Sequence, residues 1–171
     1  MISLRFAVRQ TLLGCALMCV APAGHAQGAG GETVTGVLRV TLDVADSCTV
    51  AASDLNFGNL QSQSPSPQLG ETSLQLRCTK GLGAEVALET GLGPGATPEQ
   101  RKMQSGGNVL IYSLYRDSAR TLVWGTAPGL DTLHVTGTGM PETIPVYGAI
   151  PAGQAVPPGE YGDVIVVQVL F

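Results

Sequence analysis

Apolar and polar residues alternate along the chain from Thr33 to Val44. Alternation with a period of two is typical of a β-strand that has one buried face. This pattern predicts a strand in which apolar side chains and one glycine share the same side. The positions in that phase are Val34, Gly36, Leu38, Val40, Leu42 and Val44.

Short runs of similar character follow, separated by turn residues at intervals of roughly 8–15 residues, which is the spacing of a β-sandwich. Residues 61–70 are rich in Ser, Pro and Gln and predict a loop. The run 164–171 is mostly Val, Ile, Leu and Phe, so we expect a strand that is covered on both faces. The predicted strands span residues 48–50, 55–57, 72–78, 84–88, 109–115, 123–124, 133–136, 143–150 and 164–171.

One segment, Thr97 to Met103, has the signals of a helix start. Thr97 can act as the N-cap, Pro98 suits the first helical position, and Gln100 stands where a capping box requires it. The segment therefore predicts one or two turns of helix.

The first 26 residues have the pattern of a secretory signal peptide. Arg5 and Arg9 precede an apolar run at 12–20, and small residues then lead to Ala26. A basic start, an apolar middle and small residues before the cut are the three parts of such a leader. We expect cleavage after Ala26, with Ala23 as the alternative. The apolar run is shorter than the ~20 residues of a spanning helix, and no other stretch approaches that length.

Composition narrows the class of protein. Hydrophobic residues make up 44% of the 171 residues and charged residues only 13%, so disorder by high charge is excluded. There are 23 Gly and 11 Pro, which leaves little room for long helices. The net charge is −4 and aromatic residues are 5%, a balance that argues against binding of nucleic acid.

Two cysteines, Cys48 and Cys78, remain after removal of the leader. An even pair in an exported chain predicts a disulfide. The alternative is a metal or redox site, for which the spacing fits no CxxC pattern and only His134 is left as a histidine partner.

Signatures of catalysis are mostly absent from the sequence, and we expect no catalytic, cofactor or metal site. The segment 91–96 matches a loosened dinucleotide fingerprint but lacks the crossover helix that such a site needs. His134 has no companion histidine. Tyr161 lies in a turn before the last strand, where we expect its hydroxyl to bond the backbone as in a tyrosine corner.

Several short motifs occur in order between Thr33 and Phe171: Cys48 to Val50, Leu55 to Gly58, Leu76 to Gly81, Tyr112 to Asp117, Trp124-Gly125, Val146 to Pro151, Gly159 to Asp163 and Val169 to Phe171. In their order and spacing, these motifs resemble the spore coat protein U domain family. Thr33 to Gly36 and the strand after it are similar to the start of Csu-type major pilins, which are subunits of archaic chaperone–usher pili. The likeness covers nearly the whole mature chain.

The resemblance implies an all-β fold, namely an incomplete immunoglobulin-like β-sandwich completed by donor strand complementation. It divides the chain into a signal peptide (1–26), an N-terminal extension that serves as donor strand (27–44) and a pilin domain (45–171). A periplasmic pilus chaperone first fills the gap, and the N-terminal strand of an identical or related subunit then replaces it. An outer-membrane usher exports the fibre to the cell surface, where it would serve attachment and biofilm formation.

The same resemblance implies two sets of site residues. The donor strand would present Val34, Gly36, Leu38, Val40 and Leu42, with the glycine over a shallow part of the groove. The acceptor groove and chaperone contact would be Ile165, Val167, Val169 and Phe171. A terminal strand as apolar as this one would otherwise be an adhesive sheet edge. Tip adhesins of the family resemble two such domains in tandem, so a single domain favours a shaft subunit.

Three other interpretations stay open. Residues 33–44 could form an ordinary first strand of the chain's own sandwich. The protein could be a secreted monomeric coat, matrix or carbohydrate-binding protein, although one Trp and scattered Tyr make a poor sugar platform. A secreted enzyme would need His134 paired with an acid.

Overall fold

The computed structural model describes residues 32–171, so the expected signal peptide and residues 27–31 lie outside the described residues. The chain divides after Thr41 into two units. In the first unit, residues 32–41 belong to no helix or strand. All the strands described below belong to the second unit, residues 42–171.

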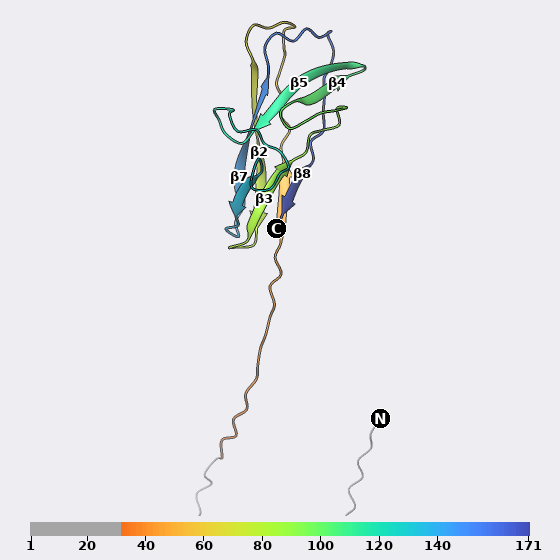
Figure 1. The fold of residues 1–171 in the computed structure, drawn as a ribbon. Helices are drawn as coiled ribbons and strands as arrows, with labels where there is room; N and C mark the ends of the chain where they lie inside the picture. Colours follow the sequence, from red (N-terminus) through yellow and green to blue (C-terminus); the bar gives the residue numbers. More distant parts are fainter. Residues whose placement is uncertain (1–31) are drawn as a thin grey trace, which may run out of the picture. The chain divides into compact units, whose positions relative to one another are not determined.

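The second unit is built from antiparallel strands in two sheets (Figure 1). The larger sheet has the order β1-β2-β7-β5-β4 and the smaller one β6-β3-β8. The bounds are β1 Cys48–Ala52, β2 Gln68–Cys78, β3 Gly83–Leu88, β4 Arg101–Ser105, β5 Asn108–Tyr115, β6 Leu133–Thr136, β7 Glu142–Ile150 and β8 Val167–Leu170.

Alternation along the strands places one face of each sheet in a shared core. In β2, Leu74 and Leu76 are buried while Gln75 between them is exposed. The smaller sheet contributes Val86 and Leu88 to the same cluster. The predicted all-β sandwich is confirmed, and residues 32–171 contain no helix.

One side of the sandwich is closed by Trp124, which is completely buried between the sheets. Its main-chain N–H donates to the Leu114 carbonyl of β5 at 2.9 Å, and its indole N–H donates to the Val86 carbonyl of β3 at 2.8 Å. The next residue, Gly125, accepts the Leu88 N–H at 3.0 Å. Hydrogen bonds from one segment to both sheets therefore hold this side together, so any opening of the sandwich lies elsewhere.

Arg101 reinforces the closed side. Its side chain is fully buried, and the guanidinium donates to the carbonyls of Leu88, Glu89, Pro98 and Trp124 at 2.6–3.0 Å. Burial lowers the pKa of Arg101, yet a guanidinium still holds its proton. The buried cation is thus stabilised by four carbonyl dipoles.

The predicted helix at 97–103 is wrong, because this segment is a turn followed by β4. The capping signal does form: the Thr97 hydroxyl accepts the Gln100 N–H at 3.2 Å. The main chains of Thr97 and Gln100 also bond each other in both directions, which reverses the chain instead of winding it. Arg101 then pairs with Tyr112 in the β4–β5 hairpin.

Four smaller predictions also differ. Residues 123–124 form no strand, and only Val123 makes an isolated bridge, with Tyr115. Strand β2 begins at Gln68, inside the predicted loop, because residues 68–70 pair with the end of β7. Residues 55–57 belong to no strand. In the last run only Val167–Leu170 forms a strand, and Val164 and Val166 are exposed, so it is not covered on both faces.

Candidate functional site: an open cleft beside the core

An open cleft in the second unit has a volume of about 980 Å³. Every residue from 52 to 60 and from 156 to 165 lines it. We call these two segments the first rim and the second rim. Residues 53–60 and 163–166 belong to no regular strand. The cleft therefore runs between two segments that are not joined by the hydrogen bonds of a β-sheet.

The interior of the cleft is the shared core of the two sheets. Its apolar lining comes from β2, β5 and β7 of the larger sheet and from β3 of the smaller one: Leu74, Leu88, Leu110, Leu114, Val146 and Ile150. These side chains face inward because alternate residues of a strand point to the same face. The cleft therefore lies directly against the core, while its two rims add polar residues such as Asn56 and Glu160.

Strand β8 leaves one backbone edge available beside the cleft. It pairs with β3 from Glu85↔Leu170 to Leu88↔Val167, and the two strands lie side by side in Figure 1. No other described strand pairs with β8. An edge strand with unpaired N–H and C=O groups is a template for a further strand.

Two glycines make room for the first rim over the larger sheet. Gly70 of β2 and Gly148 of β7 are direct partners in the register. A Cβ at Gly148 would lie 2.6 Å from Cζ of Phe57, and one at Gly70 would lie 3.0 Å from side-chain atoms of Leu55 and Phe57. Leu55 and Phe57 thus occupy the space of two absent side chains. The Phe57 ring also meets Tyr112 edge to face, with centroids 6.1 Å apart.

Polar groups hold the second rim in place. The Asp163 carboxylate accepts the Leu92 N–H and the Tyr112 hydroxyl, each at 2.8 Å. Burial, together with this bond to Asp163, raises the pKa of Tyr112 well above its ordinary value, so the phenol remains a hydrogen-bond donor. The Tyr161 hydroxyl donates to the Pro157 carbonyl at 3.0 Å, which confirms the predicted corner.

The expected acceptor residues of the last strand fall in three different places. Ile165 and Val167 line the cleft. Val169 packs against the core but does not line the cleft. Phe171 is 61% exposed.

The expected donor residues are all exposed in the single chain. Val34 is 92% exposed, and Leu38, Val40 and Leu42 are exposed to a similar degree. Gly36 is also exposed, and residues 32–47 belong to no strand. These apolar side chains therefore do not pack into a hydrophobic core within the described part of the chain.

Most of the cleft was not visible to sequence reasoning. In the first rim, the alternation of Leu55 and Phe57 is visible in the sequence, but it predicts a strand and not the edge of a cleft. The other lining residues belong to strands whose alternation marks them as core, and only the pairing of those strands shows which core positions border an opening. Tyr112 is one such residue.

Cys48 and Cys78 form a disulfide, as predicted. They are direct partners at the first position of the β1–β2 register, with Cα atoms 4.1 Å apart. Because the two sulfurs are bonded to each other, they are not free thiolates that could hold the alternative metal ion. The bridge ties the edge strand β1, which directly precedes the first rim, to the core.

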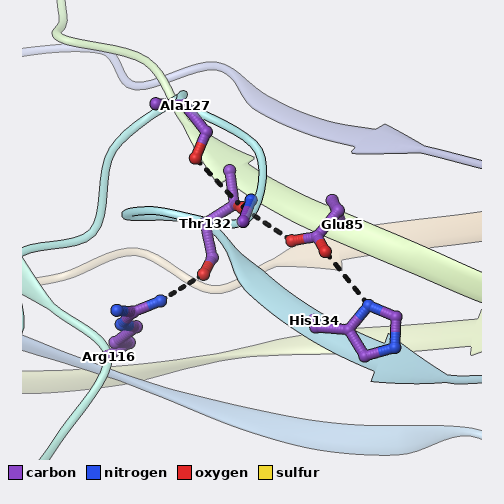
Figure 2. A network of polar contacts seen from close by, with 6 residues as sticks. Glu85, Arg116, Ala127, Thr132 and His134 are labelled. Carbon is purple, nitrogen blue, oxygen red and sulfur yellow. Dashed lines mark hydrogen bonds and ion pairs between the residues drawn. The ribbon is translucent and has the colours of Figure 1, made fainter.

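His134 does have an acid partner, which the sequence could not show. It is the direct neighbour of Glu85 across β3 and β6, and Nδ1 lies 3.0 Å from Oε1 (Figure 2). The Thr132 hydroxyl donates to Oε2 of Glu85 at 2.6 Å, and this bond is the main reason why the pKa of Glu85 is lowered.

This network does not have the order of a catalytic triad. The Thr132 hydroxyl bonds the carboxylate and not the imidazole, so His134 is not positioned to activate it. Among the described residues, Glu85 is the only hydrogen-bond partner of His134. None of the three side chains lines the cleft. The arrangement is instead a cross-strand polar contact, with Arg116 donating to the Thr132 carbonyl from below (Figure 2).

Within residues 32–171, no group of three or more His, Cys, Asp or Glu side chains could hold a metal ion. The same residues include no helix with the length and apolar character needed to cross a membrane.

Comparisons with known proteins agree with one another. A family model described as the Spore Coat Protein U domain matches residues 34–168. The chain is 31% identical to Protein U of Myxococcus xanthus over an alignment of 184 positions, which covers 99% of each chain.

A solved structure is also similar. It is the crystal structure of the CsuC–CsuE chaperone–tip adhesion subunit pre-assembly complex from archaic chaperone–usher Csu pili of Acinetobacter baumannii. The TM-score is 0.53 at 25% identity, and the match covers 75% of this chain. It covers 40% of the solved chain, so the protein spans less than half the length of that relative.

Proposed function

The chain belongs to the spore coat protein U domain family, and from this premise we propose that it is an exported structural subunit that polymerises through its N-terminal segment. Residues 33–44 of one copy would insert into the cleft of the next copy. The observation that carries the proposal is that the same chain has an open cleft against its hydrophobic core and an exposed row of apolar side chains.

The cleft and residues 33–44 have complementary chemical character. The cleft lies against the core and beside the free edge of β8, so a strand with apolar side chains could both pack there and extend the sheet. Residues 33–44 can do both, because they alternate and belong to no strand in their own chain. Burial of Val34, Leu38, Val40 and Leu42 would contribute roughly 6–12 kcal/mol before the entropy of ordering, at ~1.5–3 kcal/mol per side chain. Strand addition of this kind is known for pilins.

The partners follow from the solved relative, which is a complex of a chaperone with a tip subunit. We infer that a periplasmic chaperone holds the cleft first, that related or identical subunits replace it, and that an outer-membrane usher exports the fibre. The product would be a surface pilus that serves attachment and biofilm formation.

A second candidate is a coat or matrix protein, which is favoured by the full-length match to Protein U and by the description of the family. In that case the protein would work as a monomer or as an unordered layer. Size-exclusion chromatography of the exported protein separates the two candidates, because only the pilus subunit forms ladders of polymers and a complex with a chaperone.

The direct test uses neighbouring residues of opposite phase. Leu38 and Val37 are both exposed, at 86% and 95%, but only Leu38 belongs to the row that would enter the cleft. Leu38→Asp should abolish polymers while the complex with the chaperone persists, because an unpaired charge would be buried in the neighbour. Val37→Asp is the matched control and should polymerise. If both variants polymerise, or if Leu38→Asp also loses the chaperone complex, the proposal is wrong.

A further inference from the structure

We propose that Asp163 is a positioning residue for strand insertion: it holds residues 164–166 in line with β8 and so extends the edge on which an incoming strand pairs. This inference rests on the proposed function, because it concerns the same cleft. It gives the Tyr112 hydroxyl, which bonds Asp163, a part in binding the partner as well as in folding.

The second rim crosses from one sheet to the other just before β8. Gly162 exchanges two main-chain hydrogen bonds with Gln104 of β4, in the larger sheet, at 2.8 and 3.1 Å. Further along, the Val166 carbonyl accepts the N–H of Glu89, which follows β3 of the smaller sheet, at 3.0 Å. Residues 163–165 therefore connect the two sheets, and their course decides how far the edge of β8 extends beside the cleft.

Strand β3 does not hold this crossing. The carbonyls of Leu88 and Glu89 accept hydrogen bonds from Arg101, and the Leu88 N–H donates to the closed side of the sandwich. The regular pairing of β8 with β3 accordingly ends at Val167, opposite Leu88. Residues 163–165 therefore need an anchor outside the smaller sheet.

The Asp163 side chain supplies that anchor. Its Oδ2 accepts the Tyr112 hydroxyl of β5, and its Oδ1 accepts the N–H groups of Leu92 and Val164, all at 2.8 Å. Gly91 makes room for the carboxylate, because a Cβ there would collide with Oδ2. One side chain thus ties the crossing to the larger sheet, to the loop after β3 and to its own main chain.

The crossing matters for binding because its main chain continues the line of β8. Burial alternates without a break from Asp163 to Leu170, as it does in an extended chain, in which successive residues turn their N–H and C=O groups to opposite sides. The Val166 carbonyl points to the smaller sheet, so both groups of Ile165 point away from it. Among the described residues, neither group of Ile165 has a main-chain hydrogen-bond partner. With Asp163 in place, the edge open to an incoming strand therefore begins at Ile165.

The test compares two hydroxyl groups of β5. A labelled synthetic peptide of residues 33–44 is titrated against the chain, and binding is followed by fluorescence anisotropy. The parent chain and its variants all carry Leu38→Asp, so that their own row does not compete for the cleft. Tyr112→Phe keeps the ring and removes only the donor to Asp163. It should weaken binding about tenfold or more, since a hydrogen bond to a charged group is worth that much.

Ser113→Ala is the matched control. Ser113 follows Tyr112 in β5 but lies on the opposite face and does not line the cleft, and its buried hydroxyl donates to the Glu99 carbonyl. This variant also loses one hydrogen bond of β5, yet its binding should stay within about twofold of the parent chain. Asp163→Ala removes every bond of the carboxylate, and it should weaken binding more than Tyr112→Phe does. Urea denaturation checks that each variant is folded.

A second measurement locates the effect along the chain. Amide exchange followed by NMR should show that the bound peptide protects Ile165 as well as Val167 and Val169 in the parent chain. In Tyr112→Phe the protection should remain at Val167 and Val169 and be lost at Ile165. A tyrosine that only stabilised the fold would not move the boundary of this protection.

The outcomes separate this inference from the proposed function. If the peptide does not bind the parent chain, the donor-strand function itself fails. If it binds, and Tyr112→Phe loses no more affinity than Ser113→Ala, the positioning role of Asp163 is wrong. Protection of Ile165 that persists in Tyr112→Phe would overturn it as well.

Discussion

The disulfide offers a prediction whose magnitude follows from the structure. Cys48 and Cys78 close a loop with a sequence separation of 30 and join the first residue of β1 to the last residue of β2. Within the described residues β1 is an edge strand that pairs only with β2. In the Cys48→Ser/Cys78→Ser variant the unfolded chain regains the entropy of that loop, which corresponds to about 3.5–4 kcal/mol.

This loss should be large in a thermal scan. Residues 42–171 unfold with an entropy near 0.27 kcal/mol per kelvin, at about 2.1 cal/mol/K per residue. The midpoint of the double variant should therefore fall by roughly 13 °C. Circular dichroism at a β-sheet wavelength measures this midpoint for both proteins in oxidising buffer.

Reduction of the wild-type protein supplies the control. With a reductant present, its midpoint should fall to that of the double variant, and the variant itself should not respond. A decrease of less than about 4 °C would correspond to little more than 1 kcal/mol. That result would refute the reasoning that the bridge stabilises the fold by restricting the unfolded chain.

Three further predictions concern the buried Arg101, the carboxylate of Glu85 and the last two residues of the chain. Arg101→Met should lower the free energy of unfolding by about 3 kcal/mol or more, measured by urea denaturation, because it leaves buried carbonyls without donors. The pKa of Glu85 is lower in the folded chain than in the unfolded chain, where it is near 4.3. The ionised carboxylate therefore stabilises the fold above that pH, and this contribution is lost as the pH falls through the pKa of the folded state. The difference in thermal midpoint between wild type and Glu85→Gln should accordingly shrink between about pH 5 and pH 3, and a constant difference would contradict the assignment. Deletion of Leu170 and Phe171 should abolish recovery of the subunit with its chaperone, as measured by co-purification.

The strands could be predicted where a local pattern decides them. The runs that became β3, β5 and β7 alternate or are rich in β-branched residues, and each was located to within a residue or two. Strand β4 was missed because Thr97 and Gln100 make the same bond in a capping box and in a tight turn. Only the pairing of Arg101 with Tyr112 distinguishes the two.

The cleft could not be predicted in the same way, because it depends on contacts between distant residues. Nothing in the sequence around Phe57 indicates that Gly70 and Gly148 face each other beneath it. The contact of His134 with Glu85 likewise depends on the β3–β6 register. The donor row was visible at once, since alternation is local, and its exposure in the single chain required the structure.

Hydrogen exchange by mass spectrometry, compared between the isolated chain and its polymer, tests the central claim most directly. In the isolated chain the amides of residues 33–44 should exchange freely, because they belong to no strand. In the polymer the same amides should become protected together with those of β8, since the two would share a ladder. Free exchange at 33–44 in the polymer, or protection already present in the isolated chain, would contradict the account.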